Sequence, residues 1–366
     1  MKHAKSIGFA TLILVWAALA AFCWFAPAKE SSESERRPLA QMPQIQGETI
    51  LNGKFMGEFE DYTLDQFPLR ETFRQVKSLF HYNVLGQLDN NGIYLADGFA
   101  VKQEYPLNVT SVKHAMERLN HIYDRCLKDA GSAVFMAVVP DKGCYLAEPS
   151  GHLTLDYDAL QETVRLSMPW ASHVELADCL DAGDYYRTDT HWRQEEITGV
   201  AQRLCDALGV TSFEDGDLTC EMLERPFYGV YYGQAALPMD PEPMYVLRGE
   251  IIDGCTVYDH ETGKTGTIYD MTKLDSRDLY DVYLSGARAL LTIENPNAAT
   301  DRELIVFRDS FGSSLIPLLV KDYASVTVVD IRYVSSNLLD NFVDFHGQDV
   351  LFLYSTLILN SSNSLK

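Results

Sequence analysis

From residue 111 onward, segments with helical spacing alternate with short, apolar, strand-like segments, and this pattern restricts the fold more than any other feature of the chain. The helical segments lie at residues 111–131, 156–167, from about 313, and 335–346. The strand-like segments lie at residues 133–140, 172–179, 289–294, 303–307, 325–330 and 349–355. Alternation of this kind is typical of a parallel sheet that helices cover on both faces. We therefore predict an α/β fold with a parallel central sheet.

The alternation lapses between about residues 210 and 285, which are rich in Tyr, Gly and Pro. Residues 256–270 within this stretch have the composition of a β-hairpin, so we predict an inserted β-rich region. On the N-terminal side, residues 59–86 read as amphipathic helix, and residues 90–101 as a turn followed by a short β pair. We place one catalytic domain at residues 49–360, with the insertion inside it.

The N-terminus contains an uncharged apolar run from Ser6 to Ala28. As a helix this run is about 34 Å long, enough to span a bilayer, so we expect an N-terminal transmembrane helix. A cleaved signal peptide is the alternative for residues 1–28, because Ala26 and Ala28 form an A-x-A pattern. Lysines before the run place the N-terminus in the cytoplasm, so the chain is expected in the cell membrane as a single-pass protein with its catalytic domain outside. Residues 29–48 have the polar composition of a linker.

The chain of 366 residues has a formal net charge of −22. Without residues 1–28, which contain two lysines and no acid, 28 basic residues face 52 acidic ones, a net of −24. This balance disfavours binding to nucleic acid or to an anionic membrane surface. The six cysteines after residue 28 form no C-x-x-C pair, so disulfides and free packed thiols both remain open.

Ser310 lies in the sequence IVFRDSFGSS, residues 305–314, at the joint between a strand-like run and a helix-like run. In parallel sheets, ligands bind beyond the C-terminal ends of the strands. The start of the following helix favours negative charge, such as that of an oxyanion. Ser310 is therefore a candidate nucleophile. The alternative is that Asp309 or Ser310 only caps the helix.

A serine nucleophile needs a base, and the base needs an orienting group. Asp189 and His191 lie two residues apart in YYRTDTHWRQEE, before the apolar face of a helix. This spacing lets the carboxylate accept one imidazole N–H while the other ring nitrogen takes a proton, and Trp192 is placed to shield the ring from water. Two alternatives stay open: a helix cap by Asp189, or a metal site completed by Glu195 or Glu196. We predict no metal and no cofactor.

The segments DTHW, RDSFGSSLIPLL, VTVVDIRY and DVLFLYST together resemble the DHHW protein family of Gram-positive bacteria, which is similar to the alginate O-acetyltransferases of the SGNH-hydrolase superfamily. The resemblance implies a three-layer αβα SGNH-hydrolase-like domain. It also implies a Ser-His-Asp triad in which a D-x-H motif precedes the serine in the chain. Carried onto this sequence, the triad consists of Ser310, His191 and Asp189.

Two features depart from the family pattern. The family name implies a second histidine where this chain has Thr190, a position between the two chemical groups. The oxyanion hole of SGNH enzymes combines the serine N–H with a glycine N–H and an asparagine side chain, and the candidates here are Gly286 and Asn295, with Asn297 as the rival of Asn295. The alternative for Gly286 and Asn295 is that they only form turns.

The segment PFYGVYYGQAALP, residues 226–238, offers aromatic faces beside hydrogen-bonding groups, which suits a sugar ring. The candidate substrate-binding residues are Tyr228, Tyr231, Tyr232 and Gln234, together with Trp192. Ordinary packing of tyrosines in an irregular region is the alternative.

These observations and the resemblance lead to one functional hypothesis: an extracytoplasmic O-acyltransferase, and more specifically an O-acetyltransferase, that modifies a cell-surface polysaccharide through an acyl-serine. The resemblance implies a membrane-bound O-acyltransferase as the partner that supplies acyl groups. A carbohydrate esterase with the same triad and a non-catalytic glycan-binding or scaffold protein are the alternatives.

Overall fold

The computed structural model describes residues 2–32 and 34–366 and divides the chain into two compact units. The first, called here the N-terminal unit, contains the residues up to Asn91 together with Tyr232–Met239. The second, called the sheet unit, contains Gly92–Tyr231 and Asp240–Lys366. The predicted boundaries at residues 28, 48 and 360 remain predictions.

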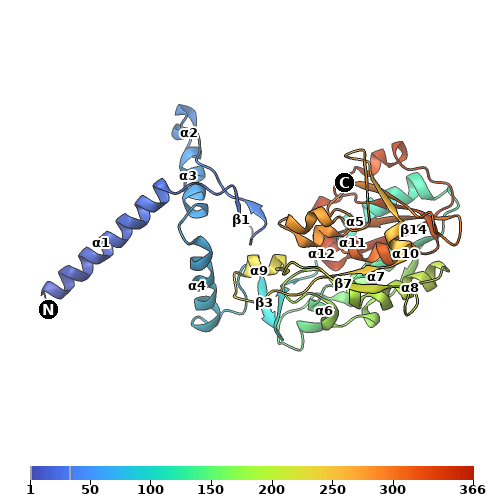
Figure 1. The fold of residues 1–366 in the computed structure, drawn as a ribbon, viewed down its shortest axis with the longest axis horizontal. Helices are drawn as coiled ribbons and strands as arrows, with labels where there is room; N and C mark the ends of the chain where they lie inside the picture. Colours follow the sequence, from blue (N-terminus) through green and yellow to red (C-terminus); the bar gives the residue numbers. More distant parts are fainter. Residues whose placement is uncertain (1, 33) are drawn as a thin grey trace. The chain divides into compact units, whose positions relative to one another are not determined.

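The N-terminal unit is mainly helical (Figure 1). Its elements are α1 (Lys2–Phe25), β1 (Ser31–Ser32), β2 (Arg37–Pro38), α2 (Gly47–Leu51), α3 (Lys54–Asp65) and α4 (Arg70–Asn83). The helices predicted between residues 59 and 86 are confirmed as α3 and α4, and Pro68 lies in the break between them. Arg37 of β2 forms an ion pair of 2.6 Å with Asp65 of α3, so residues inside the predicted linker are bound to the helices.

Helix α1 covers most of the uncharged N-terminal run. Among the described residues, however, no helix combines the length and the apolar character that crossing a membrane requires.

The sheet unit is built on one mixed sheet of eight strands in the order β10-β9-β11-β13-β12-β14-β5-β6. The strands are β5 (Val134–Val139), β6 (Ser172–Val174), β9 (Thr256–Asp259), β10 (Lys264–Gly266), β11 (Leu290–Glu294), β12 (Arg302–Arg308), β13 (Tyr323–Val329) and β14 (Asp349–Ser355). From β13 to β6 every neighbouring pair is parallel, whereas β11, β9 and β10 add antiparallel pairs at one end. The predicted α/β sheet is thus confirmed as mostly parallel, whereas residues 289–294, expected among the parallel strands, form the antiparallel strand β11. The hairpin predicted within residues 256–270 is confirmed as β9 and β10.

Helices cover both faces of this sheet because its central strands alternate buried apolar side chains between two cores. Met136 and Ile305 pack with α5 (Val109–Ile122) and α7 (Tyr157–Ser167) in one core, while Ala137 and Val306 pack with α8 (Thr198–Leu208) in the other. The remaining helices and strands of the unit are short: β3 (Ile93–Ala96), β4 (Phe99–Lys102), α6 (Gly143–Leu146), β7 (Thr219–Met222), β8 (Tyr245–Arg248), α10 (Glu250–Gly254), α11 (Gly312–Leu315) and α12 (Thr356–Asn360). Helix α9 (Val230–Ala235) spans the boundary between the two units.

Two predicted helices are shorter than their spacing indicated. The helix expected from about Ser313 consists of α11 and one 3-10 turn, Ile316–Leu318, and β13 begins at Tyr323. Pro317 lacks the N–H that a longer helix would need at that position. The segment expected as a helix at residues 335–346 is a 3-10 turn, Ser336–Asn341.

The parallel strands end at a common edge, which collects several polar loops. Ser310 follows β12, Lys142 follows β5 and Thr356 follows β14 at this edge. It is the edge at which ligands bind in sheets of this kind.

Candidate active site

Ser310 lies in a tight turn between β12 and α11, and Asp309 fixes this turn. The Asp309 side chain is fully buried. Its Oδ1 accepts the Phe311 N–H at 3.0 Å, and its Oδ2 accepts the Ser355 N–H at 2.7 Å. The turn is thereby bound to itself and to the end of the neighbouring strand β14. The N-cap residue of α11 is Phe311, which makes no side-chain cap bond, so the alternative that Asp309 or Ser310 only caps this helix does not hold. Asp309 fixes the turn instead and leaves the Ser310 hydroxyl for other contacts.

Ser310, His191 and Asp189 form a hydrogen-bonded chain although 119 residues separate the first two. The Ser310 Oγ lies 2.7 Å from His191 Nε2. The Asp189 Oδ1 lies 2.6 Å from His191 Nδ1 and 3.1 Å from the His191 backbone nitrogen, which donates to it. This is the order nucleophile, base and orienting carboxylate that activates a serine hydroxyl.

Asp189 is held from a second direction by the segment around Gly229. The Val230 N–H donates to Asp189 Oδ2 at 2.8 Å, and the Gly229 N–H donates to Thr188 Oγ1 at 2.9 Å. A Cβ atom added at Gly229 would lie 2.2 Å from the Thr188 carbonyl, so only glycine permits this approach. Glu242 completes the support, since its carboxylate accepts the Thr188 N–H and hydroxyl.

Two aromatic rings contact the imidazole of His191. Tyr280 stacks on one face with 3.9 Å between ring centroids and 9° between planes, and Phe311 lies 5.0 Å away. The Tyr280 hydroxyl hydrogen-bonds Ser314 Oγ at 2.7 Å. Burial raises the pKa of the Tyr280 phenol well above its usual range, so the phenol stays neutral. The His191 side chain is therefore largely screened from water while its Nε2 faces the serine.

Lys142 is a buried cation beneath the loop that carries Asp189. Its Nζ donates to the carbonyls of Tyr186 at 2.7 Å and Arg187 at 3.1 Å. The Nζ also lies 5.1 Å from the ring centroid of Tyr231. Burial lowers the pKa of Lys142 to about 7 from its usual 10.5. The loop is thus tied to β5, whose end carries Lys142.

Thr190, which replaces the family's second histidine, points to a neighbouring hydroxyl. The Tyr231 hydroxyl donates to Thr190 Oγ1 at 3.0 Å. Thr190 therefore adds a side-chain bond to the loop without entering the contacts among Ser310, His191 and Asp189.

Asn295, one of the two predicted oxyanion residues, lies far from Ser310. Asn295 follows β11, and Glu294 at the end of β11 pairs with Ser325, which pairs with Glu303 near the start of β12. Asn295 thus lies at the opposite edge of the sheet from Ser310. The two edges are about 17 Å apart, the length of five residues of strand β12. Its amide donates to the Val320 carbonyl, so the prediction for Asn295 is corrected.

Gly286 and Asn297 also have other roles in the fold. The Gly286 N–H donates to the Tyr283 carbonyl at 3.1 Å, and its positive φ of 76° marks a turn that favours glycine. The Gly286 carbonyl accepts from Arg308 Nη2 at 3.2 Å. Asn297, the rival, donates its N–H to Asn295 Oδ1 and so lies beside Asn295.

The predicted substrate-binding residues are divided between the two units. In the sheet unit, Trp192 has no exposed surface and donates its indole N–H to Phe311 O and Ser314 Oγ, so a direct substrate contact by Trp192 is corrected to a packing role. Tyr231 is also buried, whereas Tyr228 is 42% exposed. Tyr232 and Gln234 belong to the N-terminal unit.

The described residues, 2–32 and 34–366, contain no group of three or more His, Cys, Asp or Glu arranged to hold a metal ion. Glu196, considered above as a ligand, pairs with Arg193 at 3.0 Å. Each of the seven cysteines is free.

Sequence reasoning missed four residues that position the loop of Asp189 and His191: Lys142, Gly229, Glu242 and Tyr280. Among these four residues only Gly229, the first glycine of FYGVYYG, gives a signal, since a glycine between bulky aromatics often marks a close backbone approach. Nothing in the local pattern of the others distinguishes them from ordinary buried or surface residues.

One family of known proteins matches part of the sequence. The sequence model of the family described as DHHW protein matches residues 179–329, a range that includes Asp189, His191 and Ser310. No curated protein matches the chain.

Two solved structures share the fold. A DHHW family protein from Eubacterium siraeum is 21% identical, with a TM-score of 0.56 over 75% of this chain and 94% of its own. PatB1 from Bacillus cereus, in a structure with a sulfonyl adduct, is 16% identical, with a TM-score of 0.56 over 73% of this chain and 95% of its own. At these identities the likeness establishes the fold and nothing further.

Proposed function

Starting from the resemblance of residues 179–329 to the DHHW protein family, we propose that this chain is an O-acyltransferase that uses Ser310 as its nucleophile and a polysaccharide hydroxyl as its acceptor. The observation that carries the proposal is the continuous contact from Asp189 through His191 to Ser310, with 2.6 Å and 2.7 Å between the bonded atoms. The similarity of the sequence motifs to alginate O-acetyltransferases supports acetyl as the acyl group.

The first half-reaction transfers the acyl group to the protein. His191 Nε2 takes the Ser310 hydroxyl proton as Oγ attacks the carbonyl carbon of an acyl donor. The bond to the donor oxygen then breaks, and His191 returns the proton to that leaving oxygen. Ser310 now carries the acyl ester, while Asp189 stabilises the transient imidazolium. The Ser310 N–H is the oxyanion donor that the family resemblance implies, and Asn295 takes no part because it lies at the opposite edge of the sheet.

The second half-reaction regenerates the serine. A sugar hydroxyl gives its proton to His191 Nε2 while its oxygen attacks the acyl carbon. The bond to Ser310 Oγ breaks, and the serine oxygen receives the proton. If water attacks in place of the sugar, the acyl-serine is hydrolysed. Whether the protein is a transferase or an esterase therefore depends on whether the residues around Ser310 bind a sugar and exclude water.

The proposal includes location and partner. We place the sheet unit outside the cytoplasmic membrane and assign the supply of acyl groups to a membrane-bound O-acyltransferase. A tag at the C-terminus should be cut by protease added to intact cells. Protection of the tag until the cells are lysed would contradict this placement.

Labelling of the serine tests the nucleophile. A sulfonyl adduct is known for PatB1, so phenylmethylsulfonyl fluoride is a suitable probe of this chain. We expect one sulfonyl group per chain, mapped by mass spectrometry to Ser310, and no label in Ser310→Ala. Ser172→Ala, which removes an exposed hydroxyl on β6, is the control and should label normally. A label elsewhere, or none, would overturn the proposal.

Acyl transfer tests the acceptor. With an activated acetyl ester, the acetylated Ser310 should release its acetyl group faster when a glycan oligomer is added, and acetylated sugar should appear. Release to water at the same rate with or without sugar would identify an esterase. Glycan binding without any acyl-enzyme would identify a scaffold.

A further inference from the structure

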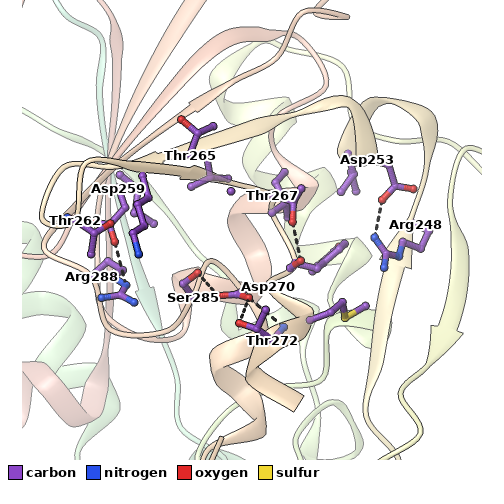
Figure 2. A pocket seen from close by; sticks show the side chains of 18 residues that line it. Arg248, Asp253, Asp259, Thr262, Thr265, Thr267, Asp270, Thr272, Ser285 and Arg288 are labelled. Atoms are coloured by element: carbon purple, nitrogen blue, oxygen red, sulfur yellow. Dashed lines mark hydrogen bonds and ion pairs between the residues drawn. The ribbon is translucent and has the colours of Figure 1, made fainter. Parts of the chain in front are cut away.

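The sheet unit contains a cavity beside the β9–β10 hairpin that is lined by none of the residues assigned to catalysis. It encloses about 750 Å³, within the usual range of ligand pockets of roughly 300 to 1,000 Å³. Its walls come from the hairpin, from α10, from residues 267–272 and from the segment that includes Ser285 and Arg288 (Figure 2).

The register of the hairpin shows which of its faces borders the cavity. Lys264 pairs with Asp259, and Gly266 pairs with Val257. Residues that pair across antiparallel strands project to the same face. All four line the cavity, so this face of the hairpin forms its wall.

The charges that line the cavity balance. Three basic side chains, Arg248, Lys264 and Arg288, accompany three carboxylates, Asp253, Asp259 and Asp270. Arg248 Nη1 contacts Asp253 Oδ1 at 2.9 Å, and Arg288 Nε lies 3.4 Å from Asp259 Oδ2 (Figure 2). A cavity without net charge favours neither an anion nor a cation, and it suits a neutral ligand with many hydrogen-bonding groups.

Hydroxyl groups are already bound by the carboxylate at the centre of this cavity. Asp270 Oδ1 accepts the Thr272 hydroxyl at 2.6 Å, and Asp270 Oδ2 accepts the Ser285 hydroxyl at 2.8 Å (Figure 2). Thr262 and Thr267 also line the cavity. Among the described residues, Arg288 Nε is buried and forms no hydrogen bond beyond its ion contact with Asp259 Oδ2.

The wall of the cavity is continuous with the catalytic site through residues 279–286. Tyr280 at one end stacks on His191, and Ser285 at the other end lines the cavity. Leu284 and Ser285 both have positive φ, 52° and 57°, a conformation that costs free energy in residues other than glycine. Strained backbone of this kind is often found at ligand sites, and here Asp270 holds it in place.

We propose that this cavity binds a neutral saccharide segment of the polymer that accepts the acyl group from Ser310. The inference rests on the proposed function for the identity of the polymer, but the binding itself requires no acyl chemistry. A second contact of this kind keeps a long glycan bound to the protein while one of its hydroxyls reaches the acyl-serine, which raises the effective concentration of acceptor.

Blocking the cavity tests the inference. A Cβ atom at Gly266 would meet no heavy atom within 4 Å and φ is not positive there, so the backbone tolerates Gly266→Trp, which adds a bulky indole to the wall of the cavity. Gly199→Trp is the matched control, because Gly199 is equally open, is exposed on α8 and lies outside the cavity. Thermal unfolding of both variants checks that they are folded.

Binding is measured by calorimetry on the full chain carrying Ser310→Ala, which prevents turnover. The probes are maltohexaose, cellohexaose and chitohexaose, with inorganic phosphate as an anionic probe. We expect at least one oligosaccharide to bind, with affinity reduced at least tenfold by Gly266→Trp and unchanged by Gly199→Trp. Failure of all three oligosaccharides to bind, equal affinity in the blocked variant, or phosphate binding abolished by Gly266→Trp would overturn the inference.

The two proposals fail separately. Sulfonyl labelling of Ser310 in the unsubstituted chain reports on the nucleophile without any saccharide. Saccharide binding by the Ser310→Ala chain reports on the cavity without the nucleophile.

Discussion

The phenol ring of Tyr280 lies flat on the imidazole of His191, with ring centroids 3.9 Å apart and planes 9° from parallel. The Tyr280 hydroxyl is anchored on Ser314, in the helix that follows the nucleophile. The base and the nucleophile are thus connected by a second route that does not pass through their own hydrogen bond. The plane of the imidazole is set by this stacking as well as by Asp189.

Removal of the ring at Tyr280 should slow acylation. Tyr280→Ala removes an aromatic contact worth about 0.5 to 1.5 kcal/mol and leaves a cavity beside His191, so we expect the rate of Ser310 labelling to fall about tenfold or more. Tyr280→Phe keeps the ring and loses only the bond to Ser314, so it should retain most of the rate. Stopped labelling reactions analysed by mass spectrometry give both rates. Equal rates in the two variants would show that stacking does not position the base.

Replacement of Asp189 by asparagine, its neutral isostere, should greatly slow acylation. In Asp189→Asn, the amide NH₂ must face either the Val230 N–H or the imidazole Nδ1, both of which donate to Asp189 in the native structure. One donor then opposes another, and the imidazole loses its orientation. We expect a loss of about three to four orders of magnitude in the acylation rate. Thr190→Ser keeps the hydroxyl that accepts from Tyr231, and it should stay within about threefold of the native rate.

Gly229 should be intolerant of any side chain. Gly229→Ala places a Cβ atom 2.2 Å from the Thr188 carbonyl, so the backbone around Asp189 must shift. We expect a loss of unfolding free energy of about 2 kcal/mol or more together with slower labelling. Gly199→Ala, in the open surface of α8, should instead be neutral or stabilise the fold by up to about 1 kcal/mol. Urea unfolding compares the two, and similar stability of the two variants would contradict the prediction.

Lys142 should make stability depend on pH. The folded pKa is about 7 and the usual value is 10.5, so between these values the unfolded chain binds more protons. The unfolding free energy therefore rises with pH across this window, by at most about 1.4 kcal/mol per pH unit, and the cost of burying the cation is largest below pH 7. Lys142→Met lacks this dependence.

Between pH 7 and pH 10, the free energy of unfolding of the native chain should therefore rise relative to that of Lys142→Met. Urea unfolding at pH 6, 7.5 and 9 provides the comparison. Parallel pH curves for the two proteins would show that Lys142 keeps its ordinary pKa in the fold.

Much of the fold could be predicted from local patterns. Runs such as residues 349–355 become strands because their side chains are buried on both faces, and burial is what an apolar run reports. The core face of α8, which includes Val200 and Leu204, follows from helical spacing in the same way. The length of the helix after Ser310 was overestimated because the apolar spacing continues past Pro317, where the helix cannot.

The direction of a strand could not be predicted from these local patterns. β11 has the apolar composition of the parallel strands β12, β13 and β14, yet it runs antiparallel to β13 and carries Asn295 to the edge opposite Ser310. Periodicity reports which side chains are buried and does not report which way the chain runs. The oxyanion prediction for Asn295 was wrong for this reason.

The sequence by itself determined the α/β class, the turn that exposes Ser310, and the two-residue spacing of Asp189 and His191, because each depends on neighbours in the chain. Only the tertiary structure decided that these residues meet, that Tyr280 covers the imidazole, and that Gly229 and Lys142 hold the loop. Those contacts join residues from 40 to more than 100 positions apart, as in the bonds from Gly229 to Thr188, from Lys142 to Tyr186 and from His191 to Ser310. Contacts at such separations depend on how the sheet and its loops pack, which local composition does not encode.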